Sequence, residues 1–101
     1  MPEMIRHIVL FTWKAETTDE QKNRVASELS ALSETVPGVR AYHFGADAGI
    51  VAADNADFAL TADFDNAEAY LVYRNHPAHL EVLEKTIKPI VERRVAAQLE
   101  I

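Results

Sequence analysis

The sequence contains no cysteine among its 101 residues. This absence excludes disulfide bonds, thiolate nucleophiles, zinc sites with Cys ligands and iron–sulfur clusters. No apolar run approaches the roughly 20 residues that a membrane-spanning helix needs, and the N-terminus lacks the basic stretch and apolar segment of a signal peptide. Because disulfides belong to oxidising compartments, the lack of cysteine also fits the cytoplasm. We therefore expect a cytoplasmic protein with no membrane partner.

Basic residues are in the minority, with 10 Lys and Arg against 16 Asp and Glu, which gives a net charge of −6. An acidic surface repels nucleic-acid backbones and anionic lipids, so we expect no nucleic-acid partner. The apolar fraction of 49% is enough for a hydrophobic core. The length suits a single domain over residues 1–101.

Motifs for cofactors and metals are missing as well. The sequence has no Gly-x-Gly-x-x-Gly, no P-loop and no Gly-x-Ser-x-Gly, and we expect no cofactor. Asp47, Asp54 and Asp57 lie in or near one predicted loop, but their spacing fits no known calcium-binding loop. His76 and His79 are close in sequence, but no carboxylate lies at a matching spacing on the same helix face. We therefore expect no metal site.

The first predicted element is a strand over residues 4–13 that is apolar on both faces. Alternate residues of a strand point to opposite faces. One face carries Ile5, His7, Val9, Phe11 and Trp13. The other carries Met4, Ile8 and Leu10, with Arg6 and Thr12. A strand of this kind is covered on both sides, and the helices of so small a chain cover only one side well. We expect a partner subunit on the other side.

A helix follows, and its start is marked by Thr18 with Gln21 three residues later, a hydroxyl cap followed by its reciprocal partner. Its apolar stripe is Val25, Leu29, Leu32 and Val36. Pro37-Gly38 ends the helix. Residues 39–47 and 57–64 are then predicted strands, joined by a loop over 48–56 that is rich in Ala, Asp, Gly and Asn.

A second helix is predicted to begin at Asp65 or Asn66 and to run to about Asn75, and Pro77 restarts the chain in a new helical turn. Its apolar stripe is Leu80, Leu83 and Ile87. Residues 91–101 form the last predicted strand. One of its faces carries Val95, Ala97, Leu99 and Ile101, and the opposite face carries Glu92, Arg94, Gln98 and Glu100.

The resulting order, β-α-β-β-α-β, predicts an α+β, ferredoxin-like sandwich with a four-stranded antiparallel sheet. Its helices lie on one face of the sheet and leave the other face open. Two such sheets that face each other across a two-fold axis form a dimeric α+β barrel. We therefore predict a homodimer.

One segment, residues 70–79, concentrates side chains that can do chemistry. We predict that Tyr73 and His79 are catalytic, since histidine serves as a general acid or base and a tyrosine hydroxyl can donate to a developing enolate oxygen. His7 lies on an otherwise apolar strand face and is predicted to share their cavity. The residues predicted to bind a small hydrophobic substrate are His7, Val9, Phe11, Phe58 and Leu83.

A structural interpretation of the same segment stays open. In it, residues 70–79 are only a junction between two helices, where His76 acts as a cap and His79 is half-buried against the sheet. His7 is then a core histidine bonded to the backbone. We interpret His43, in the second strand, as structural or as part of the subunit contact.

Several segments together resemble the stress-responsive A/B-barrel (Dabb) family over nearly the whole chain. They are the strand Ile-Arg-His-Ile-Val-Leu-Phe, the helix end Val-Pro-Gly-Val, the strand Asp-Phe-Ala-Leu and the junction Tyr-Arg-Asn-His-Pro-Ala-His. The resemblance implies a dimeric α+β barrel with a ferredoxin-like fold. Many members of this family have no established activity.

One characterised member, the plant polyketide cyclase olivetolic acid cyclase, performs an intramolecular aldol condensation with a tyrosine and a histidine that match Tyr73 and His79. Its first-strand histidine matches His7. The resemblance therefore implies a cofactor-free enzyme of cyclase or lyase type that acts on a carbonyl or polyketide-like compound. The alternative is a non-catalytic, stress-responsive or metabolite-binding protein.

Overall fold

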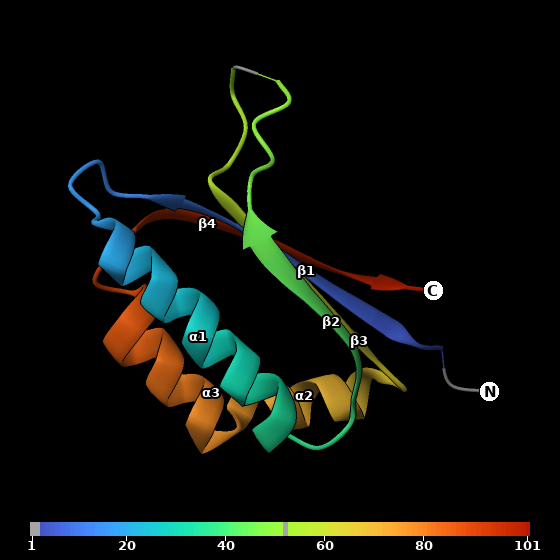
Figure 1. Cartoon of the computed structure of the whole chain (residues 1–101). Coiled ribbons are helices and arrows are strands. Elements are labelled where there is room, and N and C mark those ends of the chain that lie inside the picture. Colours follow the sequence, from blue (N-terminus) through green and yellow to red (C-terminus); the bar gives the residue numbers. More distant parts are fainter. Residues whose placement is uncertain (1–2, 52) are drawn as a thin grey trace.

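The computed structural model describes residues 3–51 and 53–101. They form a four-stranded antiparallel sheet in the order β2-β3-β1-β4 (Figure 1). The strands are β1 (Ile5–Trp13), β2 (Val39–Ala46), β3 (Phe58–Phe64) and β4 (Val91–Glu100). Each boundary lies within one residue of the prediction, and the predicted ferredoxin-like α+β fold is confirmed.

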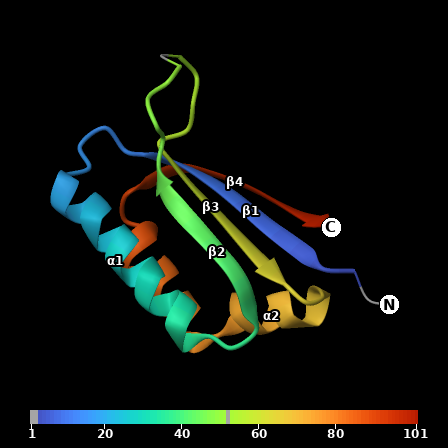
Figure 2. The same cartoon turned by 45° about the vertical axis from the view of Figure 1, so that its right-hand side comes forward.

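The helices are α1 (Asp19–Thr35), α2 (Ala67–Asn75) and α3 (Pro77–Val82), and a single turn of π-helix, η1 (Leu83–Ile87), continues α3. Figures 1 and 2 show that α1, α2 and α3 all lie on one side of the sheet. No helix in the described part of the chain is long and apolar enough to cross a membrane.

The predicted start and end of α1 are confirmed. The Thr18 hydroxyl accepts the backbone N–H of Gln21 at 3.2 Å, and the Gln21 side chain accepts the backbone N–H of Thr18 at 2.9 Å. These reciprocal bonds satisfy two amide groups that the first helical turn leaves without partners. After the helix, Gly38 has a φ of 88°, a left-handed conformation that residues with a Cβ rarely adopt.

The chain breaks its helix at His76, which has extended backbone angles (φ −64°, ψ 134°) between α2 and α3. The His76 Nδ1 accepts the backbone N–H of Ala78 at 3.1 Å, so this histidine caps α3 as the structural interpretation expected. Pro77 occupies the first turn, where its missing N–H leaves no bond unmade. The junction turns the chain between Tyr73 and His79.

The predicted apolar stripe of the last helix is wrong at Leu80, whose side chain is 49% exposed. Val82 is buried in its place, whereas the predicted Ile87 is buried and Leu83 is half-buried. The reason is that α3 and η1 turn residues 82 and 86 toward α1, where the Thr86 hydroxyl donates to the Glu28 carboxylate at 2.8 Å. Beyond Leu80, the π-turn at Leu83–Ile87 departs from the 3.6-residue period on which the prediction relied.

The strand register assigns the sheet's two faces. His7 pairs with Ala62 and Gln98, and Phe11 pairs with Phe58 and Arg94. Directly paired residues of antiparallel strands share a face of the sheet. The polar side chains of β4, Arg94 and Gln98, therefore lie on the helix side with His7. The predicted division of β4 into an apolar face and a polar face is confirmed. The apolar side chains point to the open side of the sheet.

The open face carries exposed apolar side chains from β1, β4 and their ends. Their exposed fractions are 37% for Met4, 39% for Leu10 and 47% each for Val95, Leu99 and Ile101. The helix side is the opposite case, because Val9, Phe64 and their neighbours there are almost fully buried. One face of the sheet is therefore the hydrophobic core, and the other is an uncovered apolar surface.

Candidate functional site

His79 lies in the first turn of α3, half-buried, with its imidazole held by the backbone at the end of α2. Its Nδ1 is 3.0 Å from the carbonyl oxygen of Arg74. A carbonyl oxygen only accepts hydrogen bonds, so the proton of the neutral ring lies on Nδ1. The Nε2 atom is then left with a free lone pair. The junction therefore orients His79 as a base.

Tyr73 lies beside His79, with 4.4 Å between the ring centroids, and is only 2% exposed. Its hydroxyl is 2.9 Å from the hydroxyl of Tyr42, on β2. Burial is the main cause that raises the pKa of Tyr73 above its ordinary value, and the neighbouring Tyr42 raises it further. Burial also raises the pKa of Tyr42 to about 12. Both hydroxyls stay protonated at neutral pH, and because one donates to the other, the pair keeps one O–H for a further acceptor.

His7, on β1, is 3% exposed, and its Nδ1 lies 3.0 Å from the side-chain amide nitrogen of Gln98 on β4. The amide nitrogen donates, so the proton of the neutral His7 ring lies on Nε2. The structural interpretation expected a hydrogen bond from His7 to the backbone, whereas the observed partner of its ring is the Gln98 side chain. The His7 ring is 6.4 Å from that of Tyr73 and 5.0 Å from that of Tyr70, between centroids.

Both histidines are neutral at pH 7. Burial is the main cause that lowers the pKa of His7 to about 4, and the positive charge of Arg94 lowers it further. Burial lowers the pKa of His79 as well, while its bond to the Arg74 carbonyl opposes this change. The site therefore combines an unprotonated base, His79 Nε2, with neutral donors on His7 and on the Tyr42–Tyr73 hydroxyl pair.

Two adjoining cavities reach this group. They share a wall of His7, His79, Leu83, Ile87 and Arg94. The inner cavity holds about 20 Å³ and adds Val9, Phe11, Leu29, Leu60, Tyr73 and Val82. The outer cavity holds about 320 Å³ and adds Tyr70, Arg74, Asn75, Leu80, Lys88 and Val91.

The inner cavity brings together both predicted catalytic residues and four of the five predicted substrate-binding residues. Its volume has room for about one water molecule. The outer cavity is within the size range of small-molecule sites, which begins at about 300 Å³. A substrate body therefore fits the outer cavity, and only a small reacting group fits beside Tyr73.

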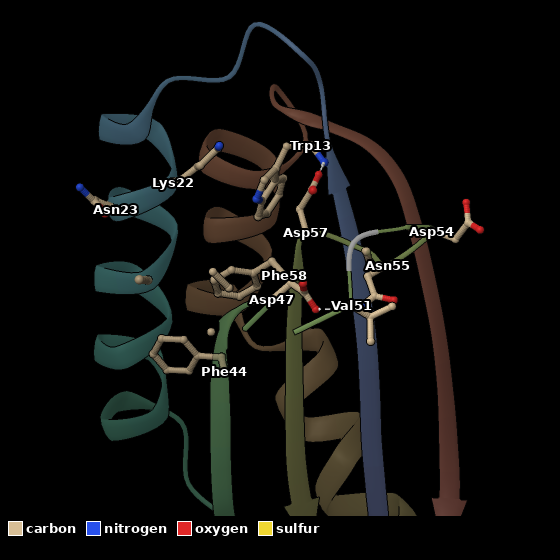
Figure 3. Close-up of a pocket in the computed structure, with 14 residues that line it drawn as sticks. Trp13, Lys22, Asn23, Phe44, Asp47, Val51, Asp54, Asn55, Asp57 and Phe58 are labelled. Atoms are coloured by element: carbon tan, nitrogen blue, oxygen red, sulfur yellow. Dashed lines mark hydrogen bonds between the residues drawn. The ribbon is translucent and has the colours of Figure 1, made fainter. Parts of the chain in front are cut away.

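Phe58 is the predicted substrate-binding residue that lies elsewhere. It lines a third space of about 550 Å³, the loop cavity, between α1 and the loop that joins β2 to β3. Figure 3 shows its ring between those of Trp13 and Phe44, along the inner side of α1. Ring centroids are 5.7 Å apart for Trp13 and Phe58, and 6.2 Å apart for Phe44 and Phe58.

Two of the three carboxylates that line the loop cavity, Asp47 and Asp57, accept hydrogen bonds from neighbouring N–H groups. Asp57 accepts the backbone N–H of Trp13 at 2.8 Å, as Figure 3 shows. Asp47 accepts the backbone N–H of Gly49 and the side-chain amide of Asn55, each at 3.1 Å. No group of three metal-ligating side chains occurs among residues 3–51 and 53–101. These aspartates therefore fasten the loop.

Sequence reasoning missed three residues of the site: Tyr42, Arg94 and Gln98. The signal for the two β4 residues was the strand pairing, because Gln98 lies opposite His7 and Arg94 lies on the same face. Tyr42 lies on β2, and the sequence does not reveal that its hydroxyl meets that of Tyr73 on α2. No local motif marks any of the three.

Comparison with known proteins gives a family. The family described as the Stress responsive A/B Barrel Domain, Dabb, matches residues 5–101. Among curated proteins, none matches the chain significantly. Among solved structures, a dimeric ferredoxin-like protein of unknown function from Thermobifida fusca is 39% identical, with a TM-score of 0.91 over 100% of this chain and 93% of that chain.

Two further solved structures are informative. A Dabb family protein with a ferredoxin-like fold from Mesorhizobium loti is 23% identical, with a TM-score of 0.83 over 98% of this chain and 97% of that chain, and shows the same fold. A hydroxynitrile lyase from Passiflora edulis is 25% identical, with a TM-score of 0.86 over 100% of this chain and 95% of that chain. The similar structures thus include one enzyme and proteins of unknown function.

Proposed function

The chain belongs to the Dabb family, the stress responsive A/B barrel domain, and on that premise we propose that it is a cofactor-independent acid–base enzyme acting on a small carbonyl compound. The observation that carries the proposal is the orientation of His79. Its Nδ1–H donates to the Arg74 carbonyl, so its unprotonated Nε2 is a base at neutral pH. Tyr73 and His7 supply neutral donors next to it.

The proposed reaction begins with removal of a proton by His79 Nε2 from a carbon alpha to a carbonyl. The electron pair moves onto the carbonyl oxygen, which becomes an enolate. Hydroxyl and imidazole N–H donors stabilise such an oxyanion in a dry site. The proton returns from the His79 imidazolium to the product, and the positive Arg94 nearby favours that return.

Two reaction types fit this chemistry. An intramolecular aldol condensation of a polyketide-like chain uses the enolate as its nucleophile. In a lyase that cleaves hydroxynitriles, the base takes the hydroxyl proton, the carbonyl forms as the bond to cyanide breaks, and the proton then leaves with cyanide as HCN. The relative from Passiflora edulis, described as a hydroxynitrile lyase, supports the second type.

A binding protein without catalysis is the second candidate. The observation that favours it is the hydroxyl pair of Tyr42 and Tyr73, because each hydroxyl already has a partner at 2.9 Å. The small inner cavity points the same way, since only about 20 Å³ is open beside Tyr73. In this case the outer cavity holds a metabolite that is not converted.

We also propose that the chain is a homodimer through the open face of its sheet. Its exposed apolar side chains on β1 and β4 need a cover, and the relative from Thermobifida fusca is described as dimeric. Light scattering is expected to give twice the chain mass at micromolar concentration, with a contact of about 1,200–2,000 Å² in total. A monomer would contradict the proposal and leave that face unexplained.

Enolisation can be tested without knowing the natural substrate. The protein is incubated in D₂O with 4-acetylbenzoate or 4-acetylbenzamide, and loss of the methyl proton signal is followed by NMR. Mandelonitrile cleavage, followed as release of benzaldehyde, tests the lyase type in parallel. We expect one of these reactions to be accelerated by the protein and slowed by His79→Gln. If neither reaction is accelerated while ligands still bind, the binding protein is the better description.

A further inference from the structure

The outer cavity differs in charge from the rest of the molecule. Three basic residues line it, Arg74, Lys88 and Arg94, and no Asp or Glu among the described residues does so. The whole chain, in contrast, has 16 acidic and 10 basic residues. The average composition of the chain does not account for a cationic cavity, so this concentration of positive charge calls for a specific explanation.

The three cations are not equivalent. The Lys88 ammonium is 2.8 Å from the Glu84 carboxylate, in an exposed ion pair one helical turn apart. Neither Arg74 nor Arg94 forms an ion pair with any carboxylate of residues 3–51 and 53–101. By comparison, Arg6 on the open face pairs with Asp63 at 2.7 Å. The two guanidinium groups at the outer cavity therefore keep their hydrogen-bond donors available.

Arg94 has a second consequence for the site. It also lines the inner cavity, so its charge belongs, with His7 and His79, to the wall that the two cavities share. That charge lowers the pKa of both His7 and His79. An anion bound to Arg94 would offset this effect without occupying the position of the base.

Apart from Asn75 and the two histidines, the remaining wall of the outer cavity is mostly apolar. It includes Leu80, Leu83, Ile87 and Val91, with the Tyr70 ring on the α2 side. A wall of this kind binds a hydrocarbon body, and a guanidinium binds a planar anion through two parallel hydrogen bonds. A volume of about 320 Å³ suits a single aromatic ring or a short chain.

We propose that the outer cavity binds a small apolar compound bearing a carboxylate, with Arg94 as the group that holds the carboxylate and Arg74 as its neighbour. This inference names the substrate class of the proposed enzyme and rests on the same site. It also holds if the protein binds its ligand without converting it.

Calorimetry with a matched pair of ligands tests the charge. 4-Acetylbenzoate and 4-acetylbenzamide share the ring and the ketone and differ in one negative charge. We expect the benzoate to bind at least about tenfold more tightly, which corresponds to one charge-assisted hydrogen bond. Inorganic phosphate is the third probe, and we expect it to bind more weakly than the benzoate because it has no apolar body.

Three variants locate the effect. Arg94→Gln should remove most of the benzoate preference, and Arg94→Lys should keep part of it. Arg93→Gln is the matched control. It removes the same positive charge from the residue next to Arg94, but Arg93 pairs with Thr12 and lies on the open face, away from the outer cavity. We expect the Arg93 variant to keep the preference. Light scattering on each variant checks that the oligomeric state is unchanged.

The outcomes separate this proposal from the proposed enzyme. Equal affinity for benzoate and benzamide, failure of both to bind, or a preference that survives Arg94→Gln would overturn the carboxylate site. Phosphate binding as tightly as the benzoate would do the same, since the apolar wall would then contribute nothing. A benzoate preference without proton exchange would keep the carboxylate site and reject only the enzyme.

Discussion

The loop cavity and the outer cavity lie on the same side of the sheet, but they differ in what their polar groups do. The loop cavity is the larger, at about 550 Å³, and its Asp47 and Asp57 accept hydrogen bonds from the chain itself. The outer cavity holds about 320 Å³, and its Arg74 and Arg94 have no carboxylate partner among the described residues.

The comparison shows that volume and chemistry need not coincide. A polar group whose hydrogen bonds are already made inside the protein stabilises a fold and has little left for a ligand. A group that keeps a free donor or lone pair, such as the His79 Nε2, can act on something else. The smaller cavity is therefore the better candidate for function, and the following changes test that contrast.

The largest expected effect is on turnover. Once a substrate is found, His79→Ala should lower kcat by about 10²–10⁴-fold, the usual contribution of a general base. Tyr73→Phe should lower it less, because the ring keeps the shape of the inner cavity. In the loop cavity, Lys22→Ala should change kcat by less than about twofold. Steady-state kinetics on the three variants decides between the cavities.

A comparable loss from Lys22→Ala would place the chemistry in the loop cavity. Full activity in His79→Ala would remove the proposed base. Because an Ala at position 79 leaves new space, His79→Gln is measured beside it. A fall in both variants, with an unchanged melting temperature, assigns the effect to the imidazole.

The next effect is on stability, in the wall of the inner cavity. Leu29, on α1, is 3% exposed, and Leu29→Ala should lower the free energy of unfolding by roughly 2–5 kcal/mol. Leu80 is 49% exposed at the outer cavity, and Leu80→Ala should cost less than about 0.5 kcal/mol. Urea denaturation measures both, and equal losses would mean that the assigned burial is wrong.

The histidines give a third contrast, in the dependence of stability on pH. The pKa of His7 is lowered from 6.5 to about 4 in the folded protein, so between these values the unfolded chain binds more protons. The corresponding stability is fully present above pH 6.5 and is lost as the pH falls toward 4. Its upper bound is about 3 kcal/mol.

His7→Gln should reduce this loss of stability between pH 7 and pH 4.5, since glutamine does not titrate. His79, whose pKa is lowered in the same direction, accounts for part of what remains. Urea denaturation across this pH range compares the His7 variant with the unchanged protein, and parallel curves for the two would exclude His7 as the cause.

Much of the fold could be predicted because its signals are local. The capping residues Thr18 and Gln21, the stop at Gly38 and the break at Pro77 act within a few residues, and each is confirmed. Alternation also separated the two faces of β1 and β4. Leu80 could not be placed correctly, because its apolar character does not reveal that Val82 and Thr86 are the residues buried toward α1.

The polar partners of the site were harder to predict. His7, Tyr73 and His79 are recognisable from residue type and position, but Gln98 and Arg94 join them only through the pairing of β1 with β4. An alternating strand with one apolar face also suggests that this face is buried in its own core. In β4 the apolar face is exposed on the open side and the polar face lines the cavity, which fits the proposed dimer contact on one side and the proposed site on the other.

The smallest expected effect concerns Asp57, one of the carboxylates that line the loop cavity. Asp57→Ala removes the acceptor for the Trp13 backbone N–H, a bond of 2.8 Å in a partly buried position. The loss should be about 1–2 kcal/mol of unfolding free energy, the cost of leaving such a donor unsatisfied. Asp57→Asn keeps an acceptor oxygen and should recover most of it. Neither change should alter turnover or the affinity for 4-acetylbenzoate, because the carboxylate serves the fold. A variant that kept its stability but lost binding or turnover would reverse the roles assigned to the two cavities.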